Sequence, residues 1–140
     1  MTATFSVPTE EDTRRLASQW LSMSRLVEGV LGHALTQELT DLDDLQSVID
    51  QDEVDSSAYA RQCLGVVLGR VMAKHIDGLD WWIVEDEYGR DPCLRYKHTT
   101  LQINPLTMIS KRLERGEHVS VRRLYQHTVE FLAERKGSVD

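Results

Sequence analysis

The stretch DWWIVEDEYGRDPCLRY, residues 80–96, holds the residues whose types and spacing could do chemistry. Four carboxylates lie within seven positions, at Glu85, Asp86, Glu87 and Asp91. Two carboxylates at a set separation across a substrate can act as a catalytic pair, and clustered carboxylate oxygens can bind metal ions. Both kinds of chemistry require the side chains to converge on one point. The elements that carry the four acids decide whether they do.

The period of the apolar residues predicts a strand over WWIVEDEY, a turn at Gly89 and a returning strand over CLRYKH. Successive side chains of a strand point to opposite faces, so Glu85 and Glu87 share one face and Asp86 points to the other. The acids therefore do not form a single cluster. Arg95 or Lys97 on the returning strand could pair with the two glutamates, worth up to about 1 kcal/mol. Two interpretations stay open: a charge-paired hairpin, or a polar binding surface at its tip.

No other motif indicates a reactive centre. The sequence holds no P-loop, no GxSxG elbow and no dinucleotide glycine fingerprint, and its five histidines show no HExxH spacing. The two cysteines are too few for a disulfide framework, and Cys63 in an apolar run is typical of a small core residue. We therefore expect no metal, no cofactor and no cysteine nucleophile.

The charge distribution narrows the class of partner. The net charge is −7, which argues against nucleic-acid binding through neutralised phosphates. Residues 1–56 carry 12 acidic and 3 basic side chains. Seven of these acids lie between positions 41 and 55, at Asp41, Asp43, Asp44, Asp50, Asp52, Glu53 and Asp55. The run is either a solvated face or a docking surface for a basic partner.

Helical patterns occupy the N-terminal region, residues 9–55. Thr9 and Asp12 are spaced as a capping box for a first helix, and Gly32 is a plausible stop. A second apolar stripe runs to Ile49, and Thr40 could cap a fresh helix within it. No apolar stretch is long enough to span a membrane, and the N-terminus lacks the pattern of a secretory signal.

A third helix is predicted from about Ser57 to Ile76, with apolar residues on most of its faces. Gly65 and Gly69 lie one turn apart in LGVVLG, where each costs about 1 kcal/mol against alanine. We expect a closely packed neighbouring element to compensate for this cost.

The remaining elements complete an α+β domain. TLQIN predicts a third strand, Pro92 belongs at a turn or an edge, and Pro105 suits the first position of a helix that ends at Gly116. A last helix begins near Ser120. The expected architecture is a single domain over residues 1–140: three N-terminal helical segments, a small antiparallel sheet of about three strands, and two C-terminal helices.

Three ordered segments, LGVVLG, WWIVEDEYGRDPCLRY and INPLTMISKRLERGE, together resemble an uncharacterised bacterial family, one of the domains of unknown function. The resemblance covers about residues 60–132 and implies no activity. It implies that a set of polar residues belongs together: Glu85, Asp86, Glu87, Tyr88, Arg90, Asp91, Lys111 and Arg112. A hydrogen-bonded network between the hairpin and the helix that carries Lys111 would account for that set.

The function expected from these observations is a small cytoplasmic protein that binds another protein. One concrete version is an immunity-type or antitoxin-like inhibitor of a toxin enzyme. The alternative is a hydrolase-like enzyme that uses acids of residues 85–91 with Lys111 or Arg112. We expect neither a nucleic-acid nor a membrane partner, and the oligomeric state stays open.

Overall fold

The computed structural model describes residues 2–138 and has the expected α+β architecture. Its elements, in chain order, are β1 (Thr4–Ser6), α1 (Glu10–Leu31), α2 (Thr40–Asp50), α3 (Ala58–His75), β2 (Leu79–Asp86), β3 (Gly89–Tyr96), β4 (Gln102–Ile103), α4 (Pro105–Glu114), α5 (Val121–Arg135) and a 3₁₀ turn, Lys136–Ser138. The three N-terminal and two C-terminal helices are confirmed. In this part of the chain the sheet has four strands, and β1 is the strand that the sequence did not predict.

The sheet is antiparallel throughout, in the order β1-β2-β3-β4. Its last strand is short: β4 pairs only with Leu94 and Arg95 of β3. In the part of the chain that the structure describes, the earlier part of β3, which contains Pro92, therefore has no strand beside it on that side. This placement agrees with the expectation that a residue without an N–H lies at an open edge.

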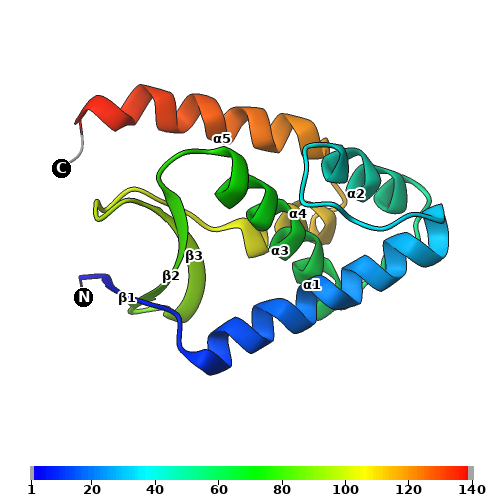
Figure 1. Ribbon diagram of the computed structural model, residues 1–140, viewed down its shortest axis with the longest axis horizontal. Coiled ribbons are helices and arrows are strands. Elements are labelled where there is room, and N and C mark those ends of the chain that lie inside the picture. The colour runs from blue at the N-terminus through cyan, green and yellow to red at the C-terminus, as the bar shows by residue number, and fades with distance from the viewer. Residues whose placement is uncertain (1, 139–140) are drawn as a thin grey trace.

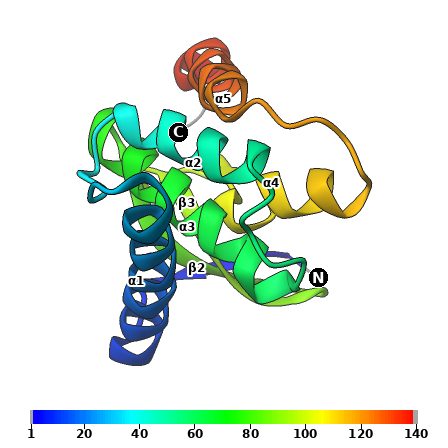
Figure 2. The ribbon, with the colours of Figure 1, turned by 90° about the vertical axis from the view of Figure 1, so that its right-hand side faces the viewer.

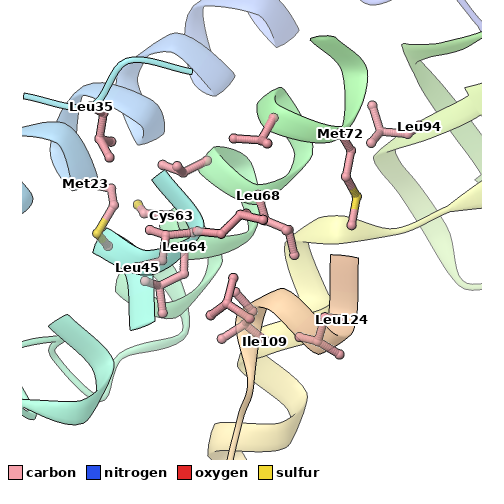
Figure 3. Close-up of a cluster of buried hydrophobic side chains, with 14 of the residues drawn as sticks. Met23, Leu35, Leu45, Cys63, Leu64, Leu68, Met72, Leu94, Ile109 and Leu124 are labelled. Atoms are coloured by element: carbon pink, nitrogen blue, oxygen red, sulfur yellow. The ribbon is translucent and has the colours of Figure 1, made fainter. Parts of the chain in front are cut away.

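Helix α3 is the centre of the molecule. Figure 1 shows it between α1 and α5, with the curved sheet at one end, and Figure 2 shows the same arrangement from the side. Leu64, Leu68 and Met72 of α3 lie in the core among side chains from the other helices and the sheet (Figure 3). Since α3 buries residues on most of its faces, its all-round apolar pattern is explained.

The two glycines of α3 lie where other elements come close. A Cβ added at Gly65 would stand 2.6 Å from the Cα of Leu106, and one added at Gly69 would stand 2.6 Å from the Trp81 ring. The compensation predicted from LGVVLG is thus confirmed: α3 packs against the start of α4 and against β2.

Helix ends follow the predicted chemistry with one exception. Thr9 and Asp12 form the capping box of α1, and Gly32 ends that helix in the left-handed conformation, with φ of 79°. Thr40 does not cap α2. It is the first helical residue, and the preceding Leu39 makes no capping hydrogen bond. Among residues 2–138 no helix is both long and apolar enough to cross a membrane.

Candidate functional site

A cleft with a volume of ≈400 Å³ lies between the β2–β3 hairpin and the start of α4. Its polar lining comes from Arg15, Gln62, Asp86, Tyr88, Arg90, Asp91, Gln102, Asn104, Thr107 and Lys111. Five of the nine predicted hairpin and helix residues therefore meet at one place: Asp86, Tyr88, Arg90, Asp91 and Lys111. The other four, Glu85, Glu87, Arg95 and Arg112, are not part of the lining.

The short β4 creates this cleft. The chain leaves the sheet after Ile103, and Pro105 immediately starts α4. Helix α4 consequently runs past the part of β3 that lacks a partner strand. Thr107 and Lys111 are four residues apart on α4, so they present one helical face to the open edge.

Asp12 and Arg90 anchor the hairpin to α1. The two guanidinium nitrogens of Arg90 donate to the two carboxylate oxygens of Asp12 at 2.8 and 2.7 Å. Asp12 is buried, with 6% of its surface exposed, and it also accepts a hydrogen bond from the Thr9 amide. The hydrogen bonds from Arg90 hold the pKa of Asp12 well below its usual range, although burial acts in the opposite direction. This pairing was not predicted from the sequence, because Asp12 already had a role in the capping box.

The tip of the hairpin is a tight turn with an aromatic side chain in solvent. The Asp86 carboxylate accepts a hydrogen bond from the Tyr88 amide at 2.8 Å, and Gly89 follows with φ of 129°. Tyr88 is 88% exposed, so its ring contributes nothing to the core. Asp86 therefore shapes the turn that presents Tyr88 beside the cleft.

Arg95 does not form the expected ion pairs with the glutamates of the hairpin. The register of the sheet places Arg90, and not Arg95, opposite Glu85. Arg95 instead donates to the carbonyl oxygens of His98 and Thr99 at 2.8 and 2.6 Å. Its guanidinium stacks on the rings of Phe5 and Trp82, at 4.2 and 4.6 Å from their centroids. Arg95 is thus held on the other face of the sheet and pairs with neither Glu85 nor Glu87.

The expected network between the hairpin and α4 is not formed. Arg112 donates to the carbonyl oxygen of Met108 in its own helix at 2.9 Å. It lines an adjoining pocket with His127, and this pocket shares four lining residues with the hairpin cleft, Lys111 among them. Among the described residues no hydrogen bond joins the hairpin to Lys111 or Arg112. The hairpin is tied to α1 because Asp12 offers a buried carboxylate, which α4 lacks.

Asp41 does not belong to an acidic surface. Only 1% of it is exposed. Its carboxylate accepts hydrogen bonds from the amides of Thr36 and Gln37 at 2.9 and 2.7 Å. Gln37 has φ of 64°, so this carboxylate fixes an unusual loop conformation before α2. Asp41 is therefore a structural residue, which corrects its place in the predicted partner surface.

Three more acids of residues 41–55 have partners within the chain. Asp43 accepts two hydrogen bonds from Arg122 of α5, at 2.7 and 2.8 Å, and these lower the pKa of its carboxyl group. Asp44 lies 2.9 Å from His33. Asp50 accepts a hydrogen bond from Gln46 at 3.0 Å. In the described chain the carboxylates of Asp52 and Glu53 accept no hydrogen bond, and Asp55 accepts only one, from the Ser57 amide at 3.4 Å.

The cysteines lie inside the molecule. Cys63 and Cys93 are both free and buried, which confirms Cys63 as a core residue. Burial raises the pKa of Cys93 to about 11, so it is a protonated thiol at neutral pH. In residues 2–138 no group of three or more acidic, histidine or cysteine side chains could hold a metal ion.

Comparison with known families adds to this geometry. The family described as Domain of unknown function (DUF3806) matches residues 41–125. The chain belongs to this family. The DUF3806 region includes the hairpin and Lys111 but begins after Asp12 and Arg15, so the anchor of Arg90 lies outside it. It starts earlier and ends earlier than the expected residues 60–132.

One solved structure shares the fold. A crystal structure from Bacteroides thetaiotaomicron VPI-5482 matches with a TM-score of 0.86 and 16% sequence identity. The match covers 94% of this DUF3806 chain and 48% of that chain, so this protein spans about half the length of its structural relative. At this identity the likeness shows the fold alone. No curated protein matches significantly.

Proposed function

We propose that this protein acts by binding another protein and that the hairpin cleft is its docking surface. The observation that carries the proposal is Tyr88, an 88% exposed ring at the rim of a polar cleft. Asp91 and Lys111 line the same cleft, and the side chains of both lack hydrogen bonds and ion pairs within the described chain. An aromatic anchor surrounded by unpaired polar groups is typical of protein-binding surfaces.

Recognition by this surface rests on side chains and not on strand addition. The open part of β3 contains Pro92, which has no N–H to donate to an added strand. A partner would place a side chain in the cleft and cover the Tyr88 ring. Lys111 and Asp91 would then select for complementary charges around it.

The charge of the whole chain favours a basic partner, because the net charge is −7. An immunity-type or antitoxin-like inhibitor of a toxin enzyme is one form of this function that suits a small acidic chain. The two buried free cysteines fit a reducing compartment, and we place the protein in the cytoplasm. A bacterial source agrees with the organism of the structural relative.

Co-purification from the native cells tests the proposal. Tagged parent protein, a Tyr88→Ala variant and a Tyr59→Ala variant are compared by mass spectrometry. Tyr59 is the matched control, since it is a second exposed tyrosine, on α3 and outside the cleft. We expect the parent and Tyr59→Ala to retain a specific partner that Tyr88→Ala loses. Equal recovery of that partner by both variants would show that the hairpin tip is not the docking surface.

A hydrolase-like enzyme is the second candidate, favoured by one observation. Asp86, Asp91 and Lys111 line the same cleft, whereas Arg112 does not. Assays with chromogenic ester, phosphate and glycoside substrates test this function. An enzyme would lose its activity in Asp91→Asn and keep it in Tyr59→Ala, and no turnover of any substrate class by the parent would dismiss the hydrolase.

A further inference from the structure

Arg70 is a partly buried cation to which the described residues offer no carboxylate partner. It lies on the central helix α3, and its guanidinium carbon is 5.2 Å from the centroid of the Trp20 ring. Within residues 2–138 it makes no hydrogen bond and no ion pair. Burial lowers the pKa of Arg70 with no carboxylate to oppose it, whereas Asp12 and Asp43 raise the pKa values of Arg90 and Arg122.

A pocket with a volume of ≈380 Å³ lies beside Arg70, between α1, the loop before α2, α3 and β2. Leu16, Ala73 and Trp81 supply an apolar wall. Thr13 and Gln37 are polar lining residues like Arg70, and no partner within the described chain uses their side chains. The pocket shares no lining residue with the hairpin cleft. Its size is that of a site for a small molecule.

The other charged residue that lines this pocket, Lys74, already has a partner. Lys74, one turn after Arg70, forms an ion pair with Glu38 at 2.5 Å. His75 also contacts Glu38, at 3.2 Å. Asp12, the buried acid of α1, forms an ion pair with Arg90. Arg70 is therefore the cation of this pocket that the described chain leaves uncompensated.

An uncompensated charge that is withdrawn from water is unfavourable unless a ligand pairs with it. Stacking on Trp20 offsets part of the cost. A guanidinium offers a planar pair of N–H donors that matches the two oxygens of a carboxylate or a phosphate. The apolar wall of Leu16 and Trp81 would accept a hydrophobic or aromatic body joined to that anionic group.

We propose that Arg70 anchors a binding site for a small organic anion, with the oxyanion on its guanidinium and an apolar body against Trp81. Thr13 and Gln37 offer further hydrogen bonds to the oxyanion. The site is independent of the docking surface proposed above, because the two are formed by different residues. A carboxylate and a phosphate share the chemistry that Arg70 recognises, and the experiment separates them.

The test is a titration of the full chain followed by nuclear magnetic resonance of the arginine Nε–H and tryptophan indole N–H groups. The probes are benzoate, phenyl phosphate and neutral benzamide. We expect saturable shifts of the Arg70 and Trp81 signals with one or both anions, and at least tenfold weaker binding of benzamide. A response to benzoate alone assigns a carboxylate ligand, and a response to phenyl phosphate alone assigns a phosphate. The Trp82 signal should stay in place, since that ring lies on the other face of the sheet.

Two charge-matched variants sharpen the test. Arg70→Gln should weaken binding of the anion at least tenfold, whereas Arg25→Gln, an exposed position on α1, should leave it unchanged. The proposal is overturned if neither anion gives a saturable shift, if benzamide binds as tightly as the anions, or if the shifts centre away from Arg70 and Trp81. These criteria need only the parent protein, so they hold even if Arg70→Gln does not fold. Parent-like affinity in a folded Arg70→Gln would also overturn it.

Discussion

Asp12 performs two tasks with one carboxylate: it completes the capping box of α1 and holds Arg90 of the hairpin. Asp43 offers a comparison, because it also lies in the first turn of a helix and also binds an arginine through both oxygens. The two pairs have similar distances but different environments. Asp12 is 6% exposed, whereas the side chain of Asp43 is 58% exposed. Solvent therefore screens the Asp43–Arg122 pair far more effectively than the Asp12–Arg90 pair.

The first prediction compares Asp12→Asn with Asp43→Asn. Hydrogen bonds to a charged group are worth roughly 1.5–3 kcal/mol when they are shielded from water, so we expect Asp12→Asn to lower the free energy of unfolding by about that amount. An exposed pair contributes less than about 1 kcal/mol, which is the limit expected for Asp43→Asn. Urea titrations of both variants measure the difference. Equal losses would contradict the view that burial makes the Asp12 pair the stronger one.

The second prediction concerns pH. The pKa of Asp12 is held below its usual range in the folded protein, mainly by the hydrogen bonds from Arg90. An aspartate in the unfolded chain has a pKa of about 3.9. The folded state thus binds the Asp12 proton less tightly than the unfolded chain does. The contribution of the charged Asp12 to the free energy of unfolding is therefore complete above pH 3.9 and is lost as the pH falls toward the pKa of Asp12 in the folded protein.

The stability gap between the parent and Asp12→Asn should therefore be constant from pH 7 to about pH 5 and should narrow below about pH 4. Urea titrations of the two proteins at pH 7, 5, 4 and 3 give the gap directly. A gap that widens as the pH falls would contradict this prediction.

At the scale of elements, the contact of α3 with α4 and β2 decides how the helices meet the sheet. Gly65 faces the backbone of α4 at Pro105 and Leu106, while Gly69 faces the Trp81 ring and the Pro105 ring. A backbone cannot rotate away from an added methyl group, but a side chain has some freedom to move. A larger residue at Gly65 therefore requires α3 and α4 to separate, whereas at Gly69 part of the overlap can be relieved by movement of the Trp81 ring.

The third prediction is an order of stability among alanine variants of three helical glycines. Gly65→Ala should destabilise most, by roughly 1–3 kcal/mol or more, and Gly69→Ala should follow. Gly29→Ala is the control, because its Cβ would meet nothing within 4 Å in α1. That change should be neutral or stabilise by up to about 1 kcal/mol. Thermal melts of the three variants establish the order, and a stabilising Gly65→Ala would refute the close-packing argument.

At the scale of the whole molecule, the acidic N-terminal region presents less unpaired negative charge to solvent than the number of its acidic residues indicates. Four of its clustered acids lie inside or pair with another side chain, which leaves Asp52, Glu53 and Asp55 near the start of α3. These three still contribute to the net charge of −7 that a basic partner would meet during its approach.

The fourth prediction concerns association with such a partner. Combined Asp52→Asn, Glu53→Gln and Asp55→Asn changes remove three negative charges, so association at low salt should be slower than for the parent. At about 0.5 M salt the difference should vanish, because the Debye length is then only a few ångströms. Stopped-flow kinetics with the co-purified partner measure both rates. Identical association rates at low salt would exclude these acids from steering.

The sequence by itself determined the elements whose physics is local. The capping box of Thr9 and Asp12, the stop at Gly32 and the start at Pro105 each depend on residues a few positions apart. The pair Gly65 and Gly69 predicted a close contact, because the cost of two glycines on one face of a helix is compensated when a neighbouring element packs closely there. Strand β1 escaped prediction, since three residues carry too little periodic signal.

Only the tertiary structure decided which side chains meet. Arg90 forms hydrogen bonds with Asp12, 78 positions away in the sequence, and not with the helix that carries Lys111. Asp41 lies inside because the amides of a distorted loop need its oxygens, although its neighbours in the sequence are exposed acids. Among residues 2–138 no carboxylate pairs with Arg70, a property of its three-dimensional surroundings that no pattern along the chain records. Charged side chains reach far and can choose among many partners, so their pairing depends on the final packing of elements that local sequence determines only one at a time.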